Sequence, residues 1–305
     1  MDAYPTKTVE LGIKKVIRYY HFFDYAPSFN LIYLFFPFYI SKRELHNFLN
    51  RMTNNHNLIS HTQNRKNMKI EHLNNTFNIC YLIFDIPLYT LPQYSISIQK
   101  QMNKYQITNV KFQKIQPYIK LLSKIPLVIM IGITGSASMG NCKKNDDIDL
   151  CVITKSKSLW ITRFICVVIA KMMNLYGKYI CLNLFFDESD LTIPQQKQTI
   201  YIGHELLQMK PVVNKNNTYE QMLSKNKWIY SLFPNAYLKS QMLNVKCQMS
   251  YVTHFTLHVT QLIDNIFKIL QLSIIRKNKT FLLITDTQLW LFKMDFEARL
   301  PHKIR

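Results

Sequence analysis

Two short groups of residues near the middle of the chain have the types and spacing needed for metal-dependent chemistry on a phosphate. Gly135-Ser136 interrupts an apolar run, and Asp147 and Asp149 follow on either side of Ile148. Carboxylates two residues apart on a strand project from one face, while the residue between them points into the core. Two hard oxygen ligands at this spacing suit Mg²⁺ or Mn²⁺, which keep water and substrate phosphate in their remaining positions. We therefore expect Asp147 and Asp149 to hold a metal ion.

Gly135 and Ser136 are candidates for binding the phosphates themselves. They lie where an expected strand gives way to a short helix, so backbone N–H groups would point at an anion. Glycine lets the backbone approach closely, and a serine hydroxyl can donate to a phosphate oxygen. Lys144 and Arg163 could add positive charge, Arg163 because it lies in an otherwise apolar helical segment and needs a partner. The alternative for both is an exposed, solvated side chain.

The elements that must position these residues alternate between strands and helices. Apolar, β-branched runs predict three strands, at 127–133, 147–154 and 178–186. Helical spacing predicts helices at 159–173, with Ser158 as N-cap, and at 200–209, 219–232 and 252–275. This order predicts an α/β (α+β) fold in which a small mixed sheet has helices on its flanks.

The segment 133–154, ITGSASMGNCKKNDDIDLCVIT, resembles the h-G-S-x(n)-D-h-D-h signature of the polymerase-β-like nucleotidyltransferase superfamily. Stretches at 157–164, 181–191, 204–212 and 226–235 are similar to a group of bacterial nucleotidyltransferase-domain proteins. The resemblance implies transfer of a nucleoside monophosphate from an NTP to a hydroxyl acceptor, with release of pyrophosphate. The acceptor stays open between a small molecule, a protein and RNA, and the motif does not select the NTP. A D-x-D pair also occurs in glycosyltransferases that bind sugar nucleotides.

The third carboxylate that the superfamily usually carries on a later strand is not at its expected place. Asn183 stands there, and Asp187 follows at the end of the expected strand. We consider Asp187 as the residue that completes the catalytic set, with ordinary turn chemistry as its alternative. A missing third carboxylate would affect catalysis more than binding, so the second hypothesis is a nucleotide-binding or regulatory module without turnover. Glu205 is expected near the site, in a core or capping role.

We expect the chain to consist of three parts. Residues 1–95 form a helical, winged-helix-like region in which Ser41 and Glu44 make a capping box. Residues 96–215 form the nucleotidyltransferase domain, and residues 216–305 form a helical C-terminal region. The Asn-, His-, Lys- and Thr-rich stretch at 51–76 is expected to be a mobile connection.

The composition bears on partners and location. The chain has 305 residues, with 38 Lys+Arg against 18 Asp+Glu, and its net charge of +20 suggests a third hypothesis, a basic nucleic-acid-binding protein. The lysines are spread along the chain, however, which favours a solvated surface. Six cysteines without a C-x-x-C pair suit reduced thiols in a cytoplasmic protein. The apolar runs are shorter than a membrane span, no secretory signal is recognised, and the oligomeric state is left open.

Overall fold

A mixed β-sheet forms the centre of the fold. The computed structural model describes residues 4–61, 87–94, 96, 98–241, 254–277, 281–292 and 300–301. Six described strands are hydrogen-bonded in the order β6-β3-β4-β5-β8-β7. Their bounds are β3 (Val128–Thr134), β4 (Ile148–Thr154), β5 (Ile180–Asp187), β6 (Lys210–Asn214), β7 (Phe281–Ile284) and β8 (Gln288–Phe292). The β4–β5 pair is parallel and its neighbours in this sheet are antiparallel, which confirms the expected mixed sheet.

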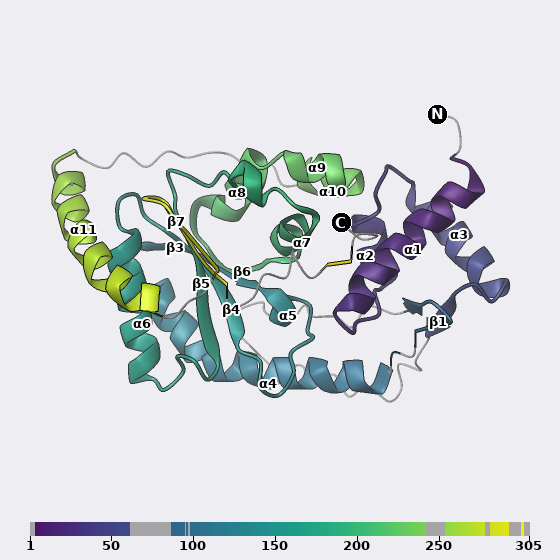
Figure 1. The fold of residues 1–305 in the computed structure, drawn as a ribbon, viewed down its shortest axis with the longest axis horizontal. Helices are drawn as coiled ribbons and strands as arrows, with labels where there is room; N and C mark the ends of the chain where they lie inside the picture. The colour runs from purple at the N-terminus through teal and green to yellow at the C-terminus, as the bar shows by residue number, and fades with distance from the viewer. Residues whose placement is uncertain are drawn as a thin grey trace.

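Helices cover both faces of this sheet, as Figure 1 shows nearly edge-on. One face is covered by α4 (Ile98–Ser123), α6 (Leu159–Met172) and α11 (His254–Lys277), and the other by α7 (Ile200–Gln208) and α8 (Thr218–Lys225). The short helix α5 (Gly135–Ser138) follows β3 and contributes Ala137 to the core on the α6 side. The side chains of β4 alternate between two hydrophobic cores. Ile148 and Leu150 pack on the α6 side, whereas Cys151 and Ile153 pack on the α7 side. The side of β4 on which a residue lies therefore decides which helices it can meet.

An N-terminal group of helices lies beyond α7, on the side away from the sheet (Figure 1). It consists of α1 (Thr6–Phe22), α2 (Phe29–Leu34) and α3 (Lys42–Asn54), with an antiparallel pair of β1 (Ile59–His61) and β2 (Leu88–Thr90). The capping box predicted at Ser41 and Glu44 is confirmed. The winged-helix-like assignment stays a prediction, and the part of the expected mobile connection at 62–76 lies outside the described residues. Gln208 donates to the Tyr20 hydroxyl and ties these helices to α7.

The C-terminal region contains helices, as expected, and also two strands. Strands β7 and β8 form a hairpin, and β8 pairs with β5 inside the main sheet. A boundary at residue 215 therefore separates strands of one sheet. These runs of four and five residues are too short to give a clear periodic signal. Strand β6 follows the expected helix at 200–209 without being predicted itself, and it contains Pro211, which is tolerated because β6 is at the edge of the sheet.

The expected helix at 219–232 is two helices, α8 and α9 (Trp228–Leu232), followed by α10 (Pro234–Gln241). The break falls at the buried Asn226, whose side-chain amide donates to the carbonyl oxygens of Leu191 and Met222 at 2.8 Å each. Those bonds replace helical bonds at this point, so one amphipathic pattern is divided by a polar contact with a neighbouring loop.

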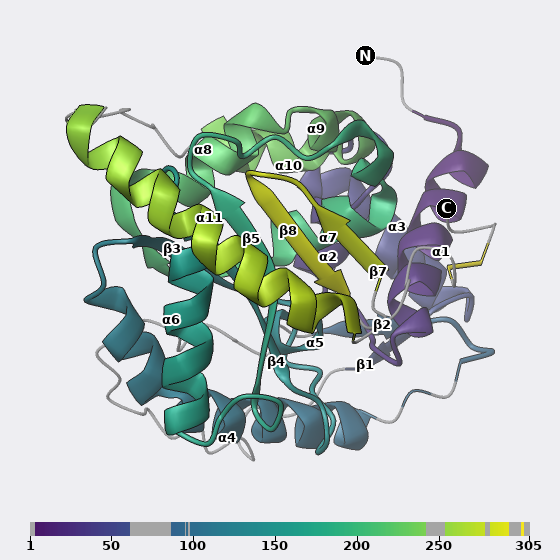
Figure 2. The same ribbon diagram turned by 60° about the vertical axis from the view of Figure 1, so that its left-hand side comes forward.

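Helix α11 crosses the outer side of α6 and the sheet (Figure 2). Its inward residues include buried polar ones, and Asp264 accepts a 2.8 Å bond from the N–H of Ile161 in the first turn of α6. The hydroxyl of Ser158, expected to cap α6, donates instead to the Lys155 carbonyl oxygen. The cap acceptor therefore comes from a distant helix. Among the described helices, none combines the length and apolar character of a bilayer span.

Candidate functional site

The turn between β3 and α5 brings Gly135 against Asp149. Strand β3 ends at Thr134, which is paired with Asp149 across the antiparallel β3–β4 ladder. Gly135 has a positive φ of 63°, and a Cβ at this position would lie 2.7 Å from Oδ2 of Asp149. Both the left-handed backbone and the close approach require glycine. The two groups that the sequence singled out are thus adjacent in space.

Asp147 and Asp149 lie at the start of β4 and flank the fully buried Ile148. Ile148 packs on the α6 side, so strand alternation directs both carboxylates to the α7 side, as predicted. Both aspartates and Ser136 are partly exposed and therefore accessible to a ligand. Within the described ranges, no cluster of three or more His, Cys, Asp or Glu residues has an arrangement ready to hold a metal ion. A metal at this place would take further ligands from water or substrate oxygens.

Asn183 contacts Asp149 directly. Its side-chain amide donates to Oδ1 of Asp149 from the adjacent parallel strand β5. The ladder shifts register here, since Leu150 pairs with Leu182 and Cys151 with Leu184, which leaves Asn183 as the extra residue. Asn183 therefore lies beside Asp149, and its assignment to the place of the third carboxylate stays a prediction. Its amide fixes the orientation of the Asp149 carboxylate rather than adding a negative charge.

Asp187 does not belong to this site, which corrects the expectation that it completes the catalytic set. It is paired with Thr154 at the opposite end of the β4–β5 ladder, about 16 Å from Asp149 at the usual rise of a strand. Its buried carboxylate accepts bonds from the Lys157 N–H at 2.6 Å, the Ser189 N–H at 2.9 Å and the Ser189 hydroxyl at 2.6 Å. These bonds close the turns at the strand ends. Asp187 therefore has the turn role that the sequence analysis gave as the alternative to a catalytic one.

Arg163 also lies away from the site, on the other face of the sheet. It is buried in α6, 7% exposed, and its Nη1 donates to Oε1 of Gln271 in α11 at 2.5 Å. Burial lowers the pKa of the guanidinium. Because α6 and the site residues are on opposite faces of β4, the expected contact with a phosphate at Gly135 is wrong. Arg163 instead joins α6 to α11.

Lys144 is exposed in the loop that leads from α5 into β4. Its backbone carbonyl oxygen accepts a 3.0 Å bond from Nζ of Lys111, and the same amine reaches the carbonyl oxygen of Asp146 at 2.5 Å. Lys111 of α4 thus shapes the loop that delivers Asp147 to β4. A contact between the Lys144 side chain and a phosphate stays a prediction.

The site includes Glu205, which the sequence analysis expected near the site in a core or capping role. Oε2 of Glu205 accepts a 2.8 Å bond from the Gly135 N–H, and this carboxylate comes from α7, distant in sequence. Burial raises the pKa of Glu205 to about 7, against the smaller lowering effect of the Gly135 bond. One acid in the apolar helix IYIGHELLQ was the available signal, because such an acid must find a polar partner.

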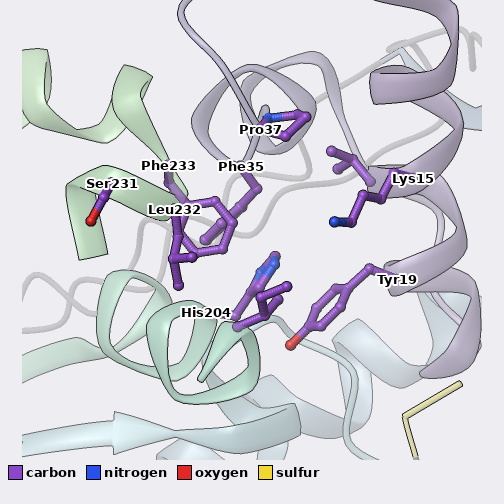
Figure 3. A pocket seen from close by; sticks show the side chains of 10 residues that line it. Lys15, Tyr19, Phe35, Pro37, His204, Ser231, Leu232 and Phe233 are labelled. Atoms are coloured by element: carbon purple, nitrogen blue, oxygen red, sulfur yellow. The ribbon is translucent and has the colours of Figure 1, made fainter. Parts of the chain in front are cut away.

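His204, the residue before Glu205 on α7, packs against the N-terminal helices, which Figure 3 shows from close by. The imidazole stacks between Tyr19 at 3.7 Å and Phe35 at 3.9 Å between ring centroids. These residues line a cavity of about 180 Å³, into which the Lys15 amine points. Burial lowers the pKa of His204 well below its ordinary value, so the ring is neutral at pH 7. This packing fixes α7, and with it the position of Glu205.

Comparison of the chain with protein-family models, with curated proteins and with solved structures gave no match. The chemistry proposed below is inferred from the residues of the site.

Proposed function

We propose that this protein is a metal-dependent nucleotidyltransferase. Asp147 and Asp149 would hold Mg²⁺ or Mn²⁺, and Gly135 and Ser136 would bind the β- and γ-phosphates of an NTP. The observation that carries the proposal is that the Asp149 carboxylate lies against the left-handed Gly135 turn. A metal ligand and a backbone N–H that can bind phosphate are therefore adjacent. A fold of this class alone would not distinguish this chemistry from others.

The proposed reaction transfers a nucleoside monophosphate from the NTP to the acceptor hydroxyl. The acceptor oxygen would form a bond to the α-phosphorus, the bond from that phosphorus to the leaving pyrophosphate would break, and the acceptor proton would pass to solvent water. A bound metal would neutralise the negative charge that builds up on the phosphate oxygens. Asn183 holds the Asp149 carboxylate in one orientation. Asp187 takes no part, because it lies at the other end of the β4–β5 ladder.

A second candidate function is a nucleotide-binding module without turnover. The observation that favours it is the contact between Asn183 and Asp149, since an amide cannot accept the acceptor proton as a carboxylate would. Such a module would bind the metal–NTP complex at the same residues and release no pyrophosphate.

The test incubates the full chain with each of the four α-labelled NTPs and Mg²⁺ or Mn²⁺ and measures pyrophosphate release and metal-dependent NTP binding. The parent is compared with the double variant Asp147→Asn/Asp149→Asn and with Asp286→Asn as control, because Asp286 is an exposed acid paired with Lys268. Loss of both signals in the double variant alone supports an enzyme. Binding without pyrophosphate release, lost in the same variant, supports the module. Undiminished binding of metal–NTP by a folded double variant would contradict both assignments.

A further inference from the structure

The backbone N–H of Gly135, one of the groups proposed to bind phosphate, already donates to a carboxylate. Its partner is Oε2 of Glu205 at 2.8 Å, a well-formed hydrogen bond. The geometry resembles that of an anion bound at the turn, with a side chain of the same protein as the anion. Glu205 therefore occupies a position that a triphosphate oxygen would need.

The two acceptors exclude each other. One N–H has one hydrogen to donate, and a phosphate oxygen bonded to Gly135 would stand where Oε2 of Glu205 now lies. A like charge next to the phosphate would also repel it, because the surroundings of Glu205 include the buried Tyr19 and Tyr20 and screen charges poorly. The stacking of His204 holds the backbone of α7, so the Glu205 side chain has to leave by turning away.

We propose that Glu205 closes the phosphate site by accepting from the Gly135 N–H when no nucleotide is bound, and that an incoming nucleoside triphosphate must displace it to bind. This inference rests on the proposed function, since it concerns the same phosphate site. It assigns to Glu205 a role in setting nucleotide affinity, through Gly135, rather than a role in holding the metal.

Two substitutions separate this role from a structural one. Glu205→Gln keeps an oxygen that can accept from Gly135 but removes the charge, and Glu205→Ala removes both. Both should bind Mg²⁺–ATP more tightly than the parent, Glu205→Ala by about tenfold, which corresponds to one hydrogen bond to a charged group. The matched control is Glu220→Gln on α8, another partly buried acid with a bond to one side chain, that of Asn214 at 2.9 Å. Its affinity should equal that of the parent.

The displacement itself can be observed at one backbone N–H. Thr134-Gly135 is the one Thr-Gly pair in the sequence, so labelling Thr carbonyls with ¹³C and Gly nitrogens with ¹⁵N isolates the Gly135 signal by NMR. We expect this signal to shift in the parent when Mg²⁺–ATP or Mg²⁺–pyrophosphate is added. In the absence of ligand it should already be shifted in Glu205→Gln.

The outcomes distinguish the inference from the proposed function. If the parent binds Mg²⁺–ATP while the Gly135 signal stays in place, or if Glu205→Ala binds more weakly and Glu205→Gln like the parent, Glu205 is structural and the inference alone is wrong. Loss of Mn²⁺ binding in Glu205→Gln would make it a metal ligand and would also overturn the inference. If neither the parent nor the Glu205 variants bind nucleotide, the inference and the proposed function fall together.

Discussion

Asp149 and Asp187 lie on adjacent parallel strands, at opposite ends of the same ladder. Asp187 is buried and accepts bonds from two backbone N–H groups and one hydroxyl, all from turns next to it in the fold. Asp149 is partly exposed and lies between the Asn183 amide and the left-handed Gly135 turn. The donors around Asp187 close turns, which is a structural role, whereas the partly exposed Asp149 suits the ligand site proposed above.

The largest effect should come from Asp149→Asn. Removing a charged metal ligand should reduce pyrophosphate release by more than about a hundredfold, because loss of an outer-shell partner alone typically costs 10–100-fold. Thermal unfolding should change little, since the side chain is partly exposed and asparagine has a similar shape. Steady-state rates and melting temperatures of parent and variant check this. An Asp149→Asn variant with normal rates of pyrophosphate release would mean that Asp149 is not a metal ligand.

The pH dependence of stability should carry a contribution from Glu205. Its folded pKa of about 7 lies above the value in an unfolded chain, so the folded state holds the proton more tightly between about pH 4.5 and 7. The free energy of unfolding should therefore fall as pH rises through this window, by at most about 3 kcal/mol. Denaturant titrations at several pH values should show a flatter profile in Glu205→Gln. Identical profiles would contradict the assigned environment of Glu205.

Asp187→Asn should have the opposite signature to Asp149→Asn. The carboxylate accepts three bonds in a buried place, so its loss should lower the free energy of unfolding by about 1–3 kcal/mol. Pyrophosphate release per folded molecule should equal that of the parent. Urea titration and the same activity assay measure both. A variant of full stability and low activity would return Asp187 to the site.

Asn183→Asp should have a smaller effect, on the stability of the protein without metal. It would place a second carboxylate in contact with Asp149, and the repulsion should lower the free energy of unfolding by about 1 kcal/mol without metal. Mg²⁺ or Mn²⁺ should restore the lost stability, because a cation between two carboxylates is favourable. Melting curves with chelator and with metal test this. A melting temperature that metal leaves unchanged would argue against a cation at Asp149.

The sequence predicted the central strands and the turn between β3 and α5 because each has a strong local signal. The β-branched run of β3, Gly135 and the aspartates around Ile148 specify strand, turn and face without information from the rest of the chain. Strand β8 lacked such a signal, since its pairing with β5 crosses a long sequence separation. Arg163 and Glu205 posed the same problem as charges on apolar helices, and only tertiary packing decides that one meets Gln271 and the other Gly135.

The most direct test of the central claim is a crystal structure with Mn²⁺ and a non-hydrolysable ATP analogue. We predict anomalous density for Mn²⁺ between the carboxylates of Asp147 and Asp149 and the analogue's phosphates. A phosphate oxygen should accept from the Gly135 N–H, with the Glu205 side chain turned away. Density for the analogue and metal at another place, with the Gly135–Glu205 bond intact, would contradict the account.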